Sequence, residues 1–208
     1  MKKREIESVI LAAGRSRRMG KDKAMLKFGA HYAIDIILDK IAGISSCTVI
    51  VLGQNYAMLT RHLTSFSTGQ TTLRFCYNKD HHLGMFSSIQ AGIGLCTGMN
   101  PILLQMIDQP LIPLQVYDSL INGIDRDHLI IQPVNFDKRP GHPLLFTPEF
   151  REIILAEQPV SNLRNLIRRY QCRRRLIQVE TKLIYSNFNT PEDLLKNKGE
   201  QQYGNFSK

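Results

Sequence analysis

A run of basic residues directly after a short apolar segment is the first feature of this sequence that could do chemistry. The apolar residues 9–13 stop at Gly14, and residues 15–27 then carry a crowd of cations: Arg15, Arg17, Arg18, Lys21, Lys23 and Lys27. A glycine at the end of a strand lets the backbone approach an anion closely, and loop N–H groups can then surround phosphate oxygens. Arg18 and Lys23 could reach the outer phosphates and offset the charge of a leaving pyrophosphate. We therefore interpret this loop as a phosphate-binding site rather than a solvated basic turn.

The two common phosphate-binding motifs do not describe this loop. A P-loop has four residues between its glycines and ends in Gly-Lys-Ser/Thr. Here five residues separate Gly14 from Gly20, and Asp22 follows Lys21. The dinucleotide fingerprint Gly-x-Gly-x-x-Gly is absent as well. The loop therefore belongs to another class of phosphate site.

The segment LAAGRSRRMGKDK (residues 11–23) resembles the signature of MobA-like nucleotidyltransferases, Leu-Ala-Ala/Gly-Gly-x-Ser-x-Arg-Met-Gly followed by a lysine. These enzymes form a branch of the nucleotide-diphosphosugar transferase superfamily that includes the molybdenum cofactor guanylyl- and cytidylyltransferases. The resemblance implies that the loop wraps a nucleoside triphosphate and that the lysine lies near the transferred phosphate. Carried over, these roles fall on Leu11, Ala12, Ala13, Gly14, Arg15, Arg18 and Lys23.

A single acid follows the most apolar segment of the chain, PILLQMIDQP (residues 101–110). An acid there costs free energy unless it faces a ligand or a cation, and magnesium that bridges phosphate oxygens needs only one or two carboxylates. From the residues alone, an acid that caps the turn at Pro110 is an equal alternative. The similarity of "IDQP" to the family's Asp-x-Pro motif implies that Asp108 binds Mg²⁺, with Mn²⁺ as the alternative metal.

A second metal motif of the family resembles NFNTPEDL (residues 187–194), where Asn187 and Asn189 stand in place of acids. Amide oxygens can also bind magnesium, although with less charge. The sequence does not distinguish which of the two amides would bind the metal. Asn189 and Thr190 also suit an ordinary helix start, and both roles can hold together.

Two further segments resemble parts of the family's substrate site. NKDHHLGMFSSIQAG (residues 78–92) resembles a serine-bearing helix start that contacts the base or ribose, which implies roles for Asn78, Gly84, Ser87 and Ser88. Without the resemblance, the two serines are only a plausible helix cap, and the small residues at 91 and 92 favour close helix–sheet packing. KRPGHPLLF (residues 138–146) resembles an acceptor-side Gly-His-Pro segment and implies a role for His142, although spacing alone favours a structural histidine.

The arginines of residues 166–175 could form an anion site for a pterin phosphate or for RNA, but cations are also typical of a helix C-terminus. We favour the second interpretation.

The chain of 208 residues carries a formal net charge of +9, which indicates an anionic partner without identifying it. The spread of the four cysteines indicates free thiols in a reducing compartment. Because the apolar run breaks at Gly14, we predict no signal peptide or membrane span and expect a cytoplasmic protein without a membrane partner.

The elements that must position these residues alternate along the chain. Short apolar runs predict strands at 7–13, 47–53, 71–78, 101–108, 128–134, 142–147 and 174–180. Helical spacing of apolar residues predicts helices at 33–44, 56–63, 85–96, 113–124, 148–157, 161–170 and 190–198. This alternation predicts an α/β fold with a mostly parallel sheet covered on both faces. It agrees with the three-layer α/β/α sandwich that the resemblance implies. We expect one domain over residues 1–198 and a polar, frayed tail over 199–208.

The leading functional hypothesis is transfer of CMP from CTP to the terminal phosphate of molybdopterin, with transient contact to a molybdoenzyme or its chaperone. "LAAG" and "GHP" resemble the cytidylyl branch, and the Ala13 methyl group should disfavour a purine, whereas "NFNTP" resembles the guanylyl branch that uses GTP. Alternatives are another acceptor such as a sugar phosphate, a cofactor chaperone without catalysis, and an RNA-binding module. The last is disfavoured because no stacking array of aromatic residues and no RNA-module signature is recognisable.

Overall fold

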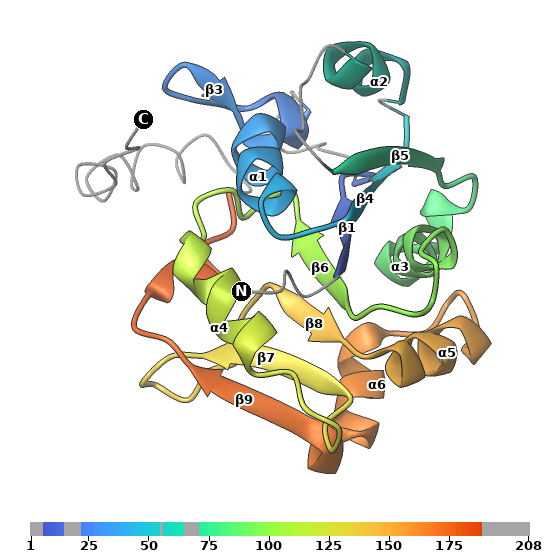
Figure 1. Ribbon diagram of the computed structural model, residues 1–208. Helices are drawn as coiled ribbons and strands as arrows, with labels where there is room; N and C mark the ends of the chain where they lie inside the picture. Colours follow the sequence, from blue (N-terminus) through green and yellow to red (C-terminus); the bar gives the residue numbers. More distant parts are fainter. Residues whose placement is uncertain (1–5, 15–21, 55, 65–70, 189–208) are drawn as a thin grey trace.

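The computed structural model describes residues 6–14, 22–54, 56–64 and 71–188, and its centre is a seven-stranded sheet (Figure 1). The strand order is β5-β4-β1-β6-β8-β7-β9. Among the described strands of this sheet, only β8 runs antiparallel, against β6 on one side and β7 on the other. The strands are β1 (Glu7–Leu11), β4 (Cys47–Leu52), β5 (Thr72–Tyr77), β6 (Ile102–Met106), β7 (Ile130–Val134), β8 (Leu144–Phe146) and β9 (Arg174–Gln178).

Helices cover both faces of this sheet and bury two separate apolar cores. One core joins the sheet to α1 and α4, and residues of α2 contribute to it. The other core joins the opposite face to α3, α5 and α6. The helices are α1 (Ala33–Ala42), α2 (Tyr56–Thr64), α3 (Met85–Gly94), α4 (Leu114–Asn122), α5 (Pro148–Ala156) and α6 (Leu163–Arg169). The predicted three-layer α/β fold is therefore confirmed.

The central strand shows why continuous apolar runs predict a sheet that is covered on both faces. Every residue of β1 is buried, between β4 and β6 in the sheet and between helices above and below it. The predicted close packing at Gly92 of α3 is also observed. A Cβ atom there would lie 2.6 Å from Val9 Cγ1 and 2.5 Å from Val51 Cγ2, so only a glycine lets this helix approach the sheet so closely.

Several short elements escaped the sequence prediction. They are the two-stranded sheet of β2 (Lys27–Phe28) and β3 (His31–Tyr32) and the 3₁₀ helices η1 (Lys23–Met25), η2 (His81–Leu83), η3 (Gln171–Arg173) and η4 (Lys182–Tyr185). Elements of two to four residues are too short to show a hydrophobic period. The predicted strand 101–108 also ends earlier, at Met106, so Asp108 lies in the turn that follows the strand. The predicted helix 190–198 and the tail 199–208 lie outside the described residues.

Three arginines at or after the end of α6 form ion pairs with acids of other segments. Ion pairs join Arg169 to Glu157, Arg173 to Glu149 at 2.7 Å and Arg175 to Asp125 at 2.7 Å. The favoured interpretation of cations at a helix C-terminus applies to Arg168 and Arg169, which lie in the last turn of α6. The described cysteines are free thiols, as expected. None of the helices in the described part of the chain has the length and apolar character needed to span a bilayer.

Candidate active site

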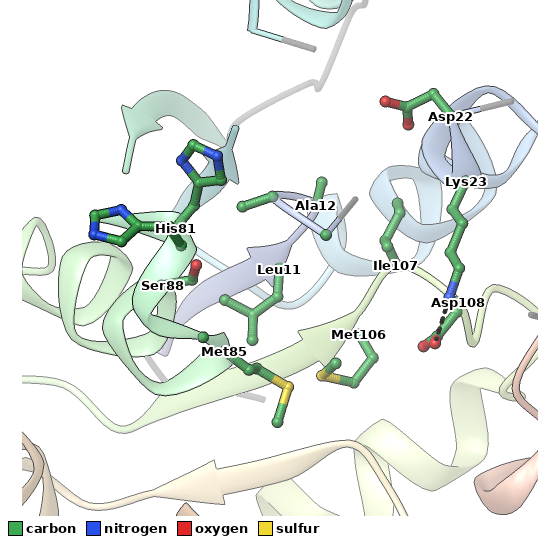
Figure 2. Close-up of a pocket in the computed structure, with 14 residues that line it drawn as sticks. Leu11, Ala12, Asp22, Lys23, His81, Met85, Ser88, Met106, Ile107 and Asp108 are labelled. Carbon is green, nitrogen blue, oxygen red and sulfur yellow. Dashed lines mark hydrogen bonds and ion pairs between the residues drawn. The ribbon is translucent and has the colours of Figure 1, made fainter. Parts of the chain in front are cut away.

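The order of the strands places a crevice next to β1. The chain proceeds from β1 to β4 and β5 on one side and then returns to β6 on the other side. In open α/β sheets, ligands bind beyond the carboxyl ends of the strands at such a switch in direction. A cavity of about 460 Å³ opens at this point (Figure 2). This volume is within the range typical of small-molecule sites, about 300–1,000 Å³.

Residues from four parts of the chain line this cavity. They come from the end of β1, from η1, from η2 with the start of α3, and from the end of β6. The lining residues are Leu11, Ala12, Ala13, Gly14, Asp22, Lys23, His81, His82, Gly84, Met85, Ser88, Met106, Ile107 and Asp108. The structure thus brings the two described ends of the predicted loop, residues 11–14 and 22–23, together with Asp108, Gly84 and Ser88. Arg15 and Arg18 lie outside the described residues.

One end of the cavity holds an ion pair between Lys23 and Asp108. Asp22 precedes Lys23 and begins η1, because its Oδ1 accepts a hydrogen bond from the Ala24 N–H at 2.8 Å. The Lys23 side chain then reaches across, and its Nζ donates to Asp108 Oδ2 at 3.3 Å (Figure 2). The two side chains are mostly buried, with exposed fractions of 21% and 16%. A cation and a carboxylate are therefore held at the same end of the cavity.

The second oxygen of Asp108 fits a role in metal binding. Asp108 Oδ1 is buried and has no hydrogen-bond partner within the described part of the chain. A buried carboxylate oxygen without a donor is costly, and a cation would satisfy it. No three His, Cys, Asp or Glu side chains of the described residues are grouped for metal binding. A metal at Asp108 would therefore need further oxygen ligands, such as side-chain amides, nucleotide phosphates or water.

Phe188, which belongs to the predicted second metal motif, lies next to Asp108. The Phe188 N–H donates to the Asp108 carbonyl oxygen at 2.9 Å, and the Phe188 ring packs edge-on against Phe28. Asn187 precedes this anchored residue and is exposed, but it does not line the cavity. Asn189 lies outside the described residues.

The other end of the cavity is built on hydrogen bonds of Asn78. Its Nδ2 donates to Ser87 Oγ at 3.0 Å and to Ser88 Oγ at 2.9 Å. The Ser87 hydroxyl in turn donates to the carbonyl oxygens of Asp80 and Gly84. Asn78 and Ser87 are thus buried supports of the turn, whereas Ser88 faces the cavity. The serines do not cap the helix, because α3 begins at Met85 and Gly84 is its N-cap, with a φ of 110°.

Two histidines that had no assigned role line this second end. His81 and His82 belong to η2, and His81 Nδ1 lies 3.1 Å from the Asn78 carbonyl oxygen. Leu11, Met85 and Met106 lie between the histidines and Asp108 and give the cavity an apolar middle (Figure 2). The place of Met106 at the end of a strand, close to Asp108 in the sequence, could have predicted that it lines the site. No pattern in the sequence distinguished the histidines from an ordinary surface turn.

The residues after β1 are positioned by the neighbouring strand. The Ala12 N–H donates to the Val51 carbonyl oxygen at 2.9 Å, which continues the contact with β4. A Cβ atom at Gly53, just past β4, would lie only 2.8 Å from the Ala13 carbonyl oxygen. Gly53 therefore lets the Ala13 peptide lie directly against the end of β4, and Ala13 and Gly14 face the cavity from this support.

His142 lies near Asp108 but does not line the cavity. Burial lowers the pKa of His142, and the nearby Asp108 carboxylate partly opposes this shift. The imidazole is therefore neutral at pH 7. Its backbone N–H donates to the Ile184 carbonyl oxygen, while its Nδ1 is buried with no hydrogen-bond partner among the residues described. The ring thus carries a buried polar atom that no described residue satisfies.

The chain is similar to several known proteins. The family model of the MobA-like NTP transferase domain matches residues 8–175. A molybdenum cofactor cytidylyltransferase of Escherichia coli is 23% identical over 190 residues, which cover 91% of this chain and 94% of that protein. A probable molybdenum cofactor guanylyltransferase of Natranaerobius thermophilus is 48% identical, over only 46 residues and 22% of each chain.

A solved structure shares the whole architecture. The Rv0371c protein of Mycobacterium tuberculosis superposes with a TM-score of 0.75 at 21% identity, over 94% of this chain and 98% of that chain. A structure of Rv0371c in complex with manganese has a TM-score of 0.72 at 19% identity, over 92% of this chain and 96% of that chain. At these identities the likeness establishes the fold alone.

Proposed function

The chain belongs to the family of MobA-like NTP transferase domains, and on this premise we propose that it transfers CMP from CTP to the terminal phosphate of a molybdopterin-type acceptor. The observation that carries the proposal is the end of the cavity where Lys23 meets Asp108. A cation for phosphate oxygens lies there with a carboxylate that has one oxygen unpartnered within the described part of the chain, and Gly14 lines the same cavity. These are the groups that transfer of a nucleotide between phosphates requires.

The proposed reaction is a direct displacement at phosphorus. An oxygen of the acceptor phosphate forms a bond to the α-phosphorus of CTP, the bond from that phosphorus to the bridging oxygen of the β-phosphate breaks, and pyrophosphate leaves. The Gly14 loop and Lys23 hold the triphosphate, and Lys23 offsets the charge that develops on the leaving group. Positioning and charge stabilisation suffice, so no protein nucleophile is needed.

Asp108 would hold the divalent metal, Mg²⁺ or Mn²⁺, together with Asn187 or Asn189. Bound there, the metal would neutralise phosphate charge and orient the phosphate groups. The manganese complex of the structural neighbour supports a divalent metal in this fold. The resemblance to the Gly-His-Pro segment supports a proposed contact of His142 with the acceptor phosphate, although the described structure places this residue outside the cavity lining.

The nucleoside is proposed to extend from Lys23 toward the second end of the cavity, where Gly84, Ser88 and the two histidines lie. CTP is favoured because the Ala13 methyl group lines the cavity and takes space that a purine would need. The cytidylyltransferase relative supports this choice along most of the chain. GTP is the second candidate, because Asn187 and Asn189 resemble the guanylyl branch and a guanylyltransferase matches a shorter segment.

Pyrophosphate release with each of the four nucleoside triphosphates, a molybdopterin acceptor and Mg²⁺ tests the proposal. We expect turnover with CTP and its loss in Asp108→Ala. The matched control is Asp118→Ala, which removes an exposed acid of α4. Preferential turnover with GTP would overturn the choice of base. No release with any nucleotide, and no thermal stabilisation by any of them, would overturn the proposed function.

A further inference from the structure

The loop that carries Asp108 is held from within by side chains that the proposed chemistry does not use. Gln105 of β6 directs its amide into this loop, and its Nε2 donates to the carbonyl oxygens of Met106 at 2.8 Å and Gln109 at 3.1 Å. The Tyr117 hydroxyl of α4 donates to Gln105 Oε1 at 2.9 Å and fixes the orientation of the amide. Gln105 and Tyr117 are completely buried. They therefore hold the backbone on both sides of Asp108.

Lys40 holds the second half of the same loop. It lies in the last turn of α1, and its Nζ donates to the carbonyl oxygens of Pro110 at 2.7 Å and Ile112 at 2.8 Å. Both distances are within the usual range of strong hydrogen bonds from an ammonium group. The loop is thus tied to α1, the helix that follows the Lys23 segment in the chain.

Packing alone does not account for a lysine at this position. Burial lowers the pKa of Lys40 to about 8, so the folded protein keeps the ammonium form at neutral pH against a cost of desolvation. An apolar side chain of similar length would fill the same space without that cost. What the ammonium adds is two directed hydrogen bonds to the backbone that follows Asp108.

We propose that Lys40 is a positioning residue for the metal site: its ammonium group fixes the loop after Asp108 and so keeps the Asp108 carboxylate opposite Lys23. This inference rests on the function proposed above. Gln105 holds the loop at the carbonyl groups of Met106 and Gln109. Lys40 holds it at the carbonyl groups of Pro110 and Ile112. A loop held at these points keeps the carboxylate in one place before the metal arrives. Groups that orient a metal ligand commonly change metal affinity by about 10- to 100-fold when they are removed.

The test measures Mn²⁺ binding by electron paramagnetic resonance, in the presence of a CTP analogue with a methylene bridge between the α- and β-phosphates. Lys40→Met is expected to weaken Mn²⁺ binding by about 10-fold or more. Lys182→Met, which removes an exposed lysine, is expected to leave it unchanged. If Lys40→Met does not fold, Lys40→Gln replaces it under the same criterion, because its shorter amide cannot reproduce both hydrogen bonds.

A double-mutant cycle shows whether Lys40 acts through Asp108. In the Asp108→Asn background, Lys40→Met is expected to cause little further loss of Mn²⁺ affinity, whereas a purely structural effect would add in full. A folded Lys40 variant that binds Mn²⁺ as tightly as the wild-type protein would overturn this inference alone. Full additivity of the Lys40 and Asp108 substitutions would do the same. Failure of the wild-type protein to bind Mn²⁺ with the analogue would overturn both this inference and the proposed function.

Discussion

At the scale of single residues, the candidate site depends on two side chains that neutralise each other. Lys23 and Asp108 are 85 positions apart in the sequence and meet at 3.3 Å. Asp108 also keeps one buried oxygen without a donor among the described residues. We expect a bound nucleotide and metal to replace this ion pair, with the ammonium turning to phosphate oxygens and the carboxylate to the metal. The pair thus keeps both groups in place until substrate binds.

Lys23→Ala should lower kcat by about 100-fold, because it removes a charged donor aimed at the leaving phosphates. The fold should persist, since the Lys23 side chain lies at the cavity and not in an apolar core. Steady-state rates of pyrophosphate release, with a thermal melt of the same preparation, check both statements. Lys182→Ala is the control. Near-normal turnover in the folded Lys23 variant would exclude its proposed role.

Ala13→Gly should shift nucleotide preference toward GTP. Ala13 lines the cavity, and one methyl group in such a pocket changes discrimination by about 10-fold or more. The measurement is the ratio of kcat/KM for CTP to that for GTP in the variant and in the wild-type protein. An unchanged ratio would mean that base selection lies elsewhere, with the histidine end of the cavity as the next place to examine.

At the scale of elements, the ends of strands and short turns build the site. Ala12 and Ala13 after β1 lie against the end of β4. The other pieces are η1, which carries Lys23, η2, which carries the two histidines, and the turn after β6, which carries Asp108. Each of these pieces is short and has little stability of its own. Their positions therefore depend on contacts with the rigid sheet, such as the one between Gly53 and the Ala13 peptide.

Gly53→Ala should displace the Ala13 peptide and weaken nucleotide binding by about 10-fold, because the new methyl group would lie 2.8 Å from the Ala13 carbonyl oxygen. Isothermal titration with CTP and Mg²⁺ measures the change. Gly94→Ala is the matched control, since a Cβ atom there meets no atom within 4 Å. Equal affinities in both variants would show that the β4 end does not position the loop.

At the scale of the whole molecule, the buried lysine couples stability to pH. The pKa of Lys40 falls from 10.5 to about 8 on folding because of burial. Between these two values the unfolded chain holds a proton that the folded chain has released, so the free energy of unfolding rises with pH. The rise that Lys40 contributes is at most about 3 kcal/mol and is absent below about pH 8.

Urea denaturation from pH 7 to pH 10.5 measures this contribution as the difference between the wild-type protein and Lys40→Met. We expect the difference to change in favour of the wild-type protein as the pH rises, with most of the change above pH 8. Lys182→Met should follow the wild-type curve throughout. Curves for wild type and Lys40→Met that stay parallel would show that the lysine titrates alike in the folded and unfolded states.

Much of the fold could be predicted because its signals are local. Buried strands such as β1 and β4 are continuous apolar runs, and α1 carries apolar residues at helical spacing, so each segment indicates its own structure. The antiparallel direction of β8 and the small β2–β3 sheet have no such signal. Strand direction depends on which neighbour a segment meets, and a strand of two residues has no measurable period.

By itself, the sequence determined the candidate residues for the proposed chemistry: the glycine and cations after β1, and the acid after the most apolar strand. Only the tertiary structure decided that Lys23 and Asp108 face each other, that Ser88 lines the cavity while Ser87 supports the turn, and that Lys40 holds the Asp108 loop. Residue type and local spacing follow from neighbours along the chain. Contacts between distant segments exist only after β1 and β6 pair, because the sheet brings their carboxyl ends to one edge.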